Sequence, residues 1–300
     1  MRYYAVFDIG GSSVKHALMD EEGGIHSEGS FKTPKTSLSE LLSGMAQVAE
    51  SYGKLQKIEG IPVSAPGAVN IRTGIIEGAS ALPYLHGPDV RAMLEEMTGK
   101  TCRFDNDANC AALAEGFNGA CRDTANYIAI VIGTGIGGAV VIDRKLVRGK
   151  HLHGGEFGFM IMEDIYREPI GTTYSHNAST YAIVLEAAKI MNVDPDMLDG
   201  EKVFMLAESG DAEMGALIGR FYKRLAVGIF NLQYAIDPDK IVVSGAVTKR
   251  PDFFDRLNGV LGRMKNEFAK IHVQVEPCFH KNNANLVGAL YSYRQQLGEA

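Results

Sequence analysis

The chain has 300 residues, of which 46% are hydrophobic and 22% charged, and its formal net charge is -6 with a pI near 5.8. This length allows two domains and a substantial buried core, and the composition is ordinary for a globular protein. The acidic balance argues against a general nucleic-acid or membrane-surface binder. No apolar run approaches the roughly 20 residues of a membrane-spanning helix, and we expect no signal peptide.

The four cysteines are scattered along the chain and form no CxxC pair. This pattern is typical of reduced, mostly buried thiols and predicts a cytoplasmic protein. They are Cys102, Cys110, Cys121 and Cys278.

The chain opens with a buried-type strand that ends in an acid, turns through two glycines and two serines, and resumes as a strand over 14–19. Gly10 and Gly11 let backbone N–H groups approach a phosphate, and Ser12 adds a hydroxyl. Asp8 stands where it could hold a hydrated Mg²⁺. This is not a Walker A loop, because no Gly-Lys-Ser/Thr opens a helix. The alternative is an ordinary glycine-rich hairpin.

The following segments alternate between strand and helix patterns. This order predicts a twisted mixed sheet with helices packed on it. The expected elements are a strand over 25–33, a helix over 38–52, a strand over 58–63 with a turn over 64–67, a hairpin over 73–78, a helix over 89–98 and a strand over 101–104.

An acidic segment, Asn106-Asp107, separates that last strand from an Ala/Leu/Glu run with good helix propensity. A carboxylate between a strand and a helix lies where N–H groups and the helix dipole favour its anionic form. Held there, Asp107 could accept a proton from a substrate hydroxyl. The alternative is that Asp107 or Asn106 merely caps the helix.

A second glycine loop follows the strong strand 127–132 and leads into another strand-like run. Gly133, Gly135 and Gly138 fit GxGxxG, but a dinucleotide-binding site needs a helix directly after the glycines. The β-branched residues that follow exclude it here. The loop instead repeats the first one, which suggests a nucleotide held in a cleft between two related domains.

With these motifs in place, the sequence resembles the ROK family of sugar kinases, which has the actin/hexokinase-like (ribonuclease H-like) fold. The resemblance runs in order from Asp8 to about Leu290. The matching segments are 8–15, 106–112, 133–138, the Gly-Glu-x-Gly segment 155–158 and the strand and loop 241–247. It implies an N-terminal domain of residues 1–115 plus the C-terminal helix 286–300, and a larger C-terminal domain of residues 116–285.

The resemblance also implies roles for individual residues. Asp107 would be the catalytic base, and Asp8 would hold Mg²⁺ through water. The sugar would contact Gly67, Asn106, Asp107 and Glu156. His176, near the lost zinc cluster, is a further candidate sugar contact that no family motif implies. ATP and its phosphates would contact Asp8, Gly10, Gly11, Ser12, Lys15, Gly133, Thr134, Gly135 and Gly245.

The chain departs from the family pattern at its structural zinc site. The family's zinc-binding His is replaced by Phe159, and no cysteine stands between 160 and 180. We therefore expect no zinc. His151, His153 and His176 remain nearby without thiolates or regular spacing, and the alternative is that they face the sugar or the cleft. A sugar-contacting Glu of the missing cluster falls near Ser175, which leaves room for a bulkier group on C1 of the sugar, as in a β-glucoside.

The remaining periodic segments predict packing elements of the core. They are helices over 179–191, 213–236 and 252–269, a strand over 271–276 and a closing helix over 285–296.

The predicted function is transfer of the γ-phosphate of ATP to the primary 6-hydroxyl of a hexose or β-glucoside. Glucose, β-glucosides and N-acetylmannosamine all remain open as substrates. A DNA-binding repressor of the family is disfavoured, because such proteins carry a helix-turn-helix domain before the first motif and Asp8 stands close to the start. A non-catalytic sugar sensor is disfavoured by the intact Asn106-Asp107. A homodimer would be usual for the family.

Overall fold

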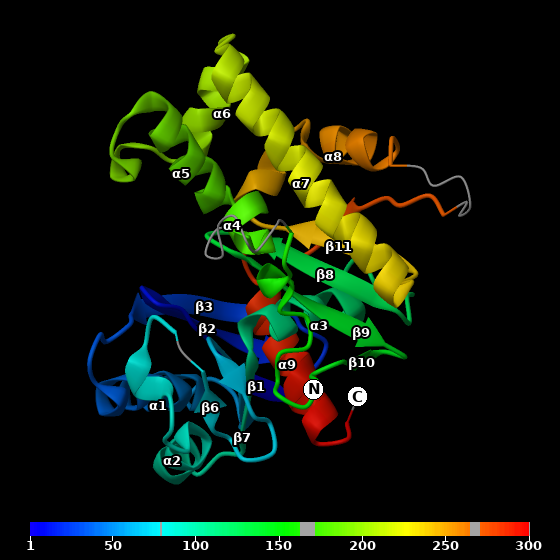
Figure 1. Cartoon of the computed structure of the whole chain (residues 1–300). Helices are drawn as coiled ribbons and strands as arrows, with labels where there is room; N and C mark the ends of the chain where they lie inside the picture. Colours follow the sequence, from blue (N-terminus) through cyan, green and yellow to red (C-terminus); the bar gives the residue numbers. More distant parts are fainter. Residues whose placement is uncertain (79, 163–171, 265–270, 300) are drawn as a thin grey trace. The chain divides into compact units, whose positions relative to one another are not determined.

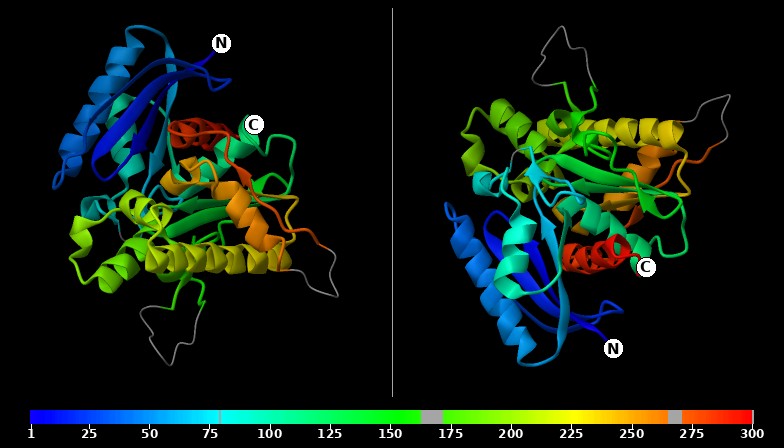
Figure 2. Two further views of the ribbon diagram at one scale, coloured as in Figure 1. Left: turned by 90° about the horizontal axis from the view of Figure 1, so that it is seen from above. Right: turned by 90° about the horizontal axis from the view of Figure 1, so that it is seen from below.

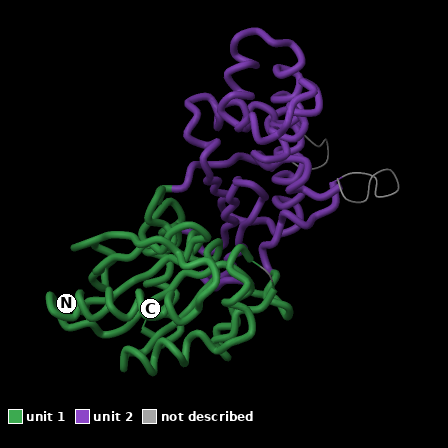
Figure 3. The backbone as a smooth tube through the Cα atoms, turned by 90° about the vertical axis from the view of Figure 1, so that its left-hand side faces the viewer, with its two compact units in different colours: residues 1–123, 148–153, 279–300 green, residues 124–147, 154–278 purple. Residues whose placement is uncertain are grey.

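The computed structural model describes residues 1–78, 80–162, 172–264 and 271–299. The chain forms two compact units (Figure 3). Unit 1 comprises residues 1–123, 148–153 and 279–300, and unit 2 comprises residues 124–147 and 154–278. The excursion 148–153 therefore belongs to unit 1 although both of its neighbours in sequence belong to unit 2.

Unit 1 is built on a five-stranded sheet in the order β3-β2-β1-β4-β7 (Figure 1). The first three strands pair antiparallel, whereas β1, β4 and β7 run parallel. A small hairpin pairs β5 with β6. The elements are β1 (Tyr3–Ile9), β2 (Ser13–Asp20), β3 (Ile25–Lys32), α1 (Leu38–Gly53), β4 (Ile58–Ala65), β5 (Ala68–Val69), β6 (Ile76–Glu77), η1 (Pro83–Leu85), α2 (Val90–Thr98), β7 (Cys102–Asn106), α3 (Asp107–Phe117) and α9 (Ala284–Gln296).

Strand β1 is buried on both faces, which explains its almost continuous apolar sequence. Its alternate residues enter different cores: Phe7 packs with α1 and β4, and Tyr4 and Val6 pack with α3 and α9. Helices α3 and α9 lie side by side in both views of Figure 2. A side chain at Gly288 of α9 would collide with the backbone of Cys110 in α3, so only glycine permits this approach.

Unit 2 has a second five-stranded sheet in the order β10-β9-β8-β11-β12. An antiparallel β8–β9 hairpin continues into parallel pairing of β8 with β11 and of β11 with β12, as β1–β2 continues into β4 and β7. The repeat predicted from the two glycine loops is thus present. The elements are β8 (Tyr127–Ile132), β9 (Ile136–Ile142), β10 (Lys145–Leu146), η2 (Phe157–Phe159), α4 (Tyr174–Ala178), α5 (Thr180–Met191), η4 (Pro195–Met197), α6 (Gly200–Glu208), α7 (Ala212–Ile236), β11 (Lys240–Ser244), η5 (Ala246–Lys249), α8 (Phe253–Leu261) and β12 (Glu276–Pro277).

Several boundaries predicted from the sequence were wrong. Strand β4 continues to Ala65 and β7 to Asn106, two residues beyond the predicted ends. Helix α8 ends at Leu261, where Gly259 and Gly262 weaken the helix, and the predicted remainder over 265–269 lies outside the described residues. The strand predicted over 271–276 is reduced to β12. The hairpin predicted over 73–78 pairs β5 with β6 across a longer connection. Among the described residues, no helix is long and apolar enough to cross a membrane.

Candidate active site

Asp107 is the first residue of α3 and follows directly on β7. Its Oδ1 accepts hydrogen bonds from the backbone N–H of Ala108 (2.8 Å) and from Asn106 Nδ2 (3.0 Å). The cap of α3 is Asn106, whose Oδ1 accepts from the N–H of Asn109 (3.1 Å). Asn106 therefore caps the helix, while Asp107 keeps its carboxylate in the first turn, where the helix dipole stabilises a negative charge.

Asn106 also connects this turn to the loop after β4. Its Nδ2 donates to the carbonyl oxygen of Gly67 at 3.0 Å. Gly67 has a φ of +100°, and a Cβ there would lie 2.9 Å from both His86 and Ile76, so glycine is required. Two of the sequence-predicted sugar contacts, Gly67 and Asn106, thus touch each other beside Asp107.

Asp8 lies at the same edge of the sheet, because Ser64 of β4 pairs with Asp8 of β1 on one side and with Asp105 of β7 on the other. Asp8 is 9% exposed. Its Oδ1 accepts hydrogen bonds from Ser64 Oγ (2.9 Å) and Asn285 Nδ2 (3.0 Å). Within the described part of the chain its Oδ2 has no partner, which fits a carboxylate that holds a water molecule of hydrated Mg²⁺.

The carbonyl groups of the first glycine turn accept hydrogen bonds from residues that follow β3. Thr33 Oγ1 donates to Gly10 O (2.7 Å), Lys35 Nζ to Gly11 O (2.7 Å) and the N–H of Thr33 to Ser12 O (3.1 Å). The N–H groups of Gly11 and Ser12 have no acceptor among the described residues. A turn with engaged carbonyls and available N–H groups is suited to an anion such as phosphate.

Lys15 lies opposite Asp8 in the β1–β2 register. Its Nζ donates to the carbonyl oxygen of Asn282 at 3.2 Å, just before α9. The Lys15 ammonium is therefore engaged with the backbone just before α9 in this structure.

The second glycine turn has the same character in unit 2. Gly133 donates its N–H to Gly135 O (2.9 Å), and Gly133 O accepts from the N–H of Thr180 (3.0 Å). The N–H groups of Thr134 and Gly135 have no acceptor among the described residues. Gly245, which follows β11, has a φ of +124°, and a Cβ there would lie 2.0 Å from Ile132 O, so it packs against the strand that carries this turn.

Ser175 contacts the second glycine turn at the start of β9. Its Oγ accepts a hydrogen bond from the N–H of Ile136 at 2.9 Å. A Cβ on Gly135 or Gly158 would lie 3.2 Å or 2.3 Å from that oxygen, so the serine is tightly enclosed. The position where the sequence suggested a lost sugar-binding Glu is therefore occupied by a small side chain with an internal role.

Glu156 and His176 are exposed residues of unit 2. Glu156 precedes η2 and makes no side-chain hydrogen bond to the described residues. In α4, the ring Nδ1 of His176 lies 2.9 Å from Thr173 Oγ1. Because both side chains are exposed, a ligand can reach them.

The described residues contain no group of three or more His, Cys, Asp or Glu side chains that could hold a metal ion. Phe159, at the family's zinc-ligand position, is 70% exposed. His153 Nδ1 lies 2.5 Å from the carbonyl oxygen of His151, a local contact within the excursion.

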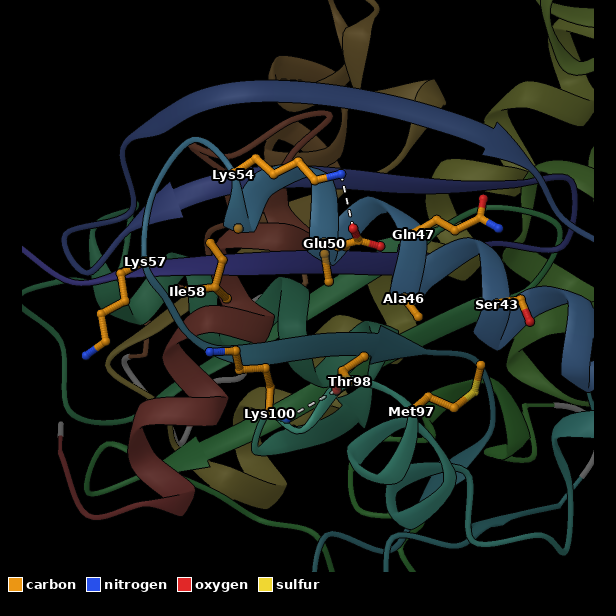
Figure 4. A pocket seen from close by; sticks show the side chains of 12 residues that line it. Ser43, Ala46, Gln47, Glu50, Lys54, Lys57, Ile58, Met97, Thr98 and Lys100 are labelled. Carbon is orange, nitrogen blue, oxygen red and sulfur yellow. Dashed lines mark hydrogen bonds and ion pairs between the residues drawn. The ribbon is translucent and has the colours of Figure 1, made fainter.

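Unit 1 also has a cavity of about 830 Å³ (Figure 4). None of the candidate active-site residues lines it. It includes Ile58, the first residue of β4, whereas Asp8 and Asn106 pair with the last residues of that strand. Its wall includes Lys54, which forms an ion pair with Glu50 at 3.0 Å. We assign it no part in the chemistry.

The sequence did not reveal the groups that hold these side chains in place. Ser64 and Asn285 orient Asp8, and a buried carboxylate, Asp105, precedes Asn106. Asn285 comes from the far end of the chain, and no local pattern distinguishes a serine or asparagine that reaches such a partner.

The paired sheets, the glycine turns and the acidic residue at the start of α3 define a two-domain α/β kinase of the actin/hexokinase type. The profile of the ROK family matches residues 3–296, and the chain belongs to this family.

The relatives and solved structures agree with the family. The chain is 34% identical to a β-glucoside kinase of Listeria monocytogenes over 294 residues, covering 97% of each protein. It matches the structure of a ROK family protein from Streptococcus pneumoniae in complex with sucrose with a TM-score of 0.89 and 33% identity, covering 99% and 100% of the two chains. A putative N-acetylmannosamine kinase from Listeria monocytogenes gives a TM-score of 0.88 and 31% identity, with coverage of 98% and 99%.

Proposed function

We propose that the chain transfers the γ-phosphate of ATP to the primary 6-hydroxyl of a hexose or β-glucoside, with Asp107 as the general base. The chain is an ATP-dependent carbohydrate kinase, as its family and its named relatives indicate. The observation that carries the mechanism is the placement of Asp107 in the first turn of α3, held by Asn106 and the N–H of Ala108.

The base works through its position and charge. Two donated hydrogen bonds and the helix dipole favour the ionised carboxylate, which accepts the proton of the sugar hydroxyl. The hydroxyl oxygen forms a bond to the γ-phosphorus as the bond from that phosphorus to the bridging oxygen of ADP breaks. Most of the acceleration comes from positioning and electrostatics, because phosphoryl transfer requires little other chemistry from the protein.

Both glycine turns bind phosphate in this proposal. The available N–H groups of Gly11 and Ser12, and of Thr134 and Gly135, bind phosphate oxygens, with Gly10, Gly133 and Lys15 completing the two turns and Gly245 contacting the adenosine end. Asp8 would hold hydrated Mg²⁺, since its Oδ2 has no partner among the described residues. When bound, Mg²⁺ would offset the negative charge of the phosphates.

The sugar hydroxyls bind to Asn106, Glu156 and the backbone at Gly67, and His176 contributes at its exposed ring edge. A β-glucoside is favoured as substrate by two observations. Ser175 is small and engaged with Ile136, so it makes no carboxylate contact to the anomeric end of the sugar. The likeness to a β-glucoside kinase extends over nearly the whole chain. N-acetylmannosamine is the second candidate, because the chain is also similar to a putative N-acetylmannosamine kinase.

The test is sugar-dependent release of ADP from Mg-ATP with glucose, cellobiose, N-acetylmannosamine, fructose or no sugar. Higher kcat/KM for cellobiose than for glucose supports a β-glucoside kinase. Preference for glucose or N-acetylmannosamine reassigns the substrate. Bound ATP without turnover on any sugar contradicts the kinase proposal and supports a sensor.

The assembly and location are also proposals. A homodimer is supported by exposed apolar side chains one helical turn apart on α5, Tyr181 and Leu185, which are 45% and 41% exposed. Light scattering of the purified protein decides between monomer and dimer. Free cysteines, three of them buried, fit a reducing compartment such as the cytoplasm.

A further inference from the structure

Asp105 is a buried carboxylate that forms an ion pair with the guanidinium of Arg148. Arg148 binds it in a bidentate geometry, with Nη1 2.7 Å from Oδ1 and Nη2 2.6 Å from Oδ2. The Asp105 side chain is fully buried, and that of Arg148 is 20% exposed. Burial opposes the charge on Arg148, yet the hydrogen bonds and charge of Asp105 raise the pKa of the guanidinium above its ordinary value.

The same carboxylate organises the start of α3. Its Oδ1 accepts from the backbone N–H of Asn106 (2.9 Å) and from Asn109 Nδ2 (3.3 Å). Its Oδ2 accepts from Ser292 Oγ of α9. Asp105 thus binds Asn106 and Asn109, which stand before and after Asp107 in the sequence. Its charge partner among the described residues is Arg148.

Arg148 is also the first residue of the excursion 148–153, which leaves the β9–β10 hairpin of unit 2, joins unit 1 and returns just before Gly155 and Glu156. The ion pair therefore fixes the start of the segment that leads to Glu156, one of the proposed sugar contacts. It connects that segment to β7, the strand that ends directly before the proposed base.

We propose that Arg148 is a positioning residue for phosphoryl transfer, which holds Asp105, and through it Asn106 and Asp107, in the geometry that the sugar hydroxyl requires. This inference rests on the proposed function. A misplacement of about 1 Å in such a constellation can lower the rate roughly a hundredfold. Arginine is needed because its planar fork satisfies both carboxylate oxygens, which a lysine ammonium cannot do.

The experiment compares Arg148→Gln and Arg148→Lys with a matched control, Arg103→Gln. Arg103 lies on β7, the strand of Asp105, is 24% exposed and forms an ion pair with Glu95 at 3.1 Å. We expect Arg148→Gln to lower kcat about a hundredfold and Arg148→Lys about tenfold. The KM for ATP should change no more than in the control. The Tm should fall further in Arg148→Gln than in the control, because the buried Asp105 loses its charge partner, so the rates are compared well below the Tm of each variant. In Asp105→Asn/Arg148→Gln the loss should be smaller than the product of the two single losses, because the residues act as a pair.

Amide hydrogen exchange of the segment 106–112 provides a readout independent of turnover. We expect at least tenfold faster exchange in Arg148→Gln and no change in Arg103→Gln. If wild-type protein phosphorylates no sugar, the proposed function fails, while the exchange result still decides the positioning role. A kcat within twofold of wild type, or unchanged exchange in Arg148→Gln, overturns the inference. Equal losses in Arg103→Gln and Arg148→Gln also overturn it, because they would reflect stability alone.

Discussion

Asn285 Nδ2, in the last helix, donates a hydrogen bond to Oδ1 of Asp8 near the end of the first strand, and the two atoms are 3.0 Å apart. Ser64 donates to the same oxygen, so both protein contacts lie on one side of the carboxylate. The arrangement orients Asp8 and leaves Oδ2 without a partner within the described residues. It gives the carboxylate a defined direction without consuming its capacity to hold a hydrated cation.

Asp8→Asn should therefore impair the use of Mg²⁺ more than the fold. Asparagine keeps the shape but removes the charge that attracts the hydrated cation. We expect at least a hundredfold lower kcat and a higher Mg²⁺ concentration for half-maximal activity, measured by titration of Mg²⁺ at saturating sugar. Asn285→Ala, which loses only the orienting bond, should cost about tenfold. Equal Mg²⁺ midpoints in wild type and Asp8→Asn would contradict the role of Asp8.

Asp107→Asn should abolish most turnover while sugar binding persists. The amide cannot accept the hydroxyl proton, and general-base catalysis typically contributes about 10²–10⁴-fold. We expect a loss of this size in kcat and sugar affinity within a few-fold of wild type by calorimetry. Asp123→Asn removes a carboxylate that is 88% exposed and serves as the control. If Asp107→Asn keeps its turnover, another residue is the base.

The sequence predicted these two acids because each stands beside a strong local pattern. Asp8 ends a buried strand before two glycines, and Asp107 stands between a strand and a helix, so residue type and position coincide. The repeat of the glycine turns also follows from local pattern, and the observed sheets share one topology.

The residues that hold the acids could not be predicted in this way. Arg148, Ser292 and Asn285 reach Asp105 or Asp8 from segments far away in the sequence. Their contacts depend on the tertiary arrangement of α9 and the excursion, which hydrophobic periodicity does not encode. The end of α8 was missed for a related reason, because packing and glycine content outweigh an apolar stripe there.

Ser175→Ala tests the support of the second glycine turn. It removes the acceptor of the Ile136 N–H and leaves that donor unsatisfied, which costs about 1–3 kcal/mol. We expect the KM for ATP to rise about tenfold with little change in sugar affinity, measured by steady-state kinetics and urea unfolding. Ser209→Ala removes an exposed hydroxyl that donates to Leu206 O, and it should alter neither quantity. An unchanged KM for ATP in Ser175→Ala would show that the turn holds without this bond.

His16 should make the protein less stable in acid. The ring packs among Phe7, Phe31 and Tyr52, and burial lowers the pKa of His16 below its ordinary value. The unfolded chain therefore binds the proton more readily than the folded one. The stabilisation is complete above the ordinary pKa of about 6.5 and is lost as the pH falls through the lowered value.

The measurement is the free energy of unfolding in urea between pH 8 and about pH 5. Wild type should lose free energy of unfolding as the pH falls, and His16→Gln should lack the part of this loss that comes from the ring. The difference in unfolding free energy between wild type and variant should therefore narrow towards acid pH. His151→Gln changes an exposed ring and should leave the pH dependence as in wild type. A constant difference between wild type and His16→Gln across this range would contradict the assignment.

Glu115, at 1% exposure, binds two chain segments that meet near the end of α3. Its Oε2 accepts from the N–H groups of Ala120 (2.8 Å) and Phe279 (2.9 Å), and its Oε1 from the N–H of His280 (2.8 Å). The carboxylate thus fixes both the segment by which the chain leaves unit 1 and the segment by which it returns. Three backbone donors converge on a group that only accepts, which an amide cannot reproduce.

Glu115→Gln should consequently lower the free energy of unfolding by about 1–3 kcal/mol, since its single oxygen leaves at least one backbone N–H facing an amide donor. Glu115→Ala should cost more, because all three N–H groups lose their acceptor. Glu50→Gln, at a carboxylate that is 71% exposed and paired with Lys54, should remain within about 0.5 kcal/mol of wild type. Urea unfolding of the three variants gives the comparison, and equal stability of Glu115→Gln and wild type would show that solvent replaces the carboxylate at these segments.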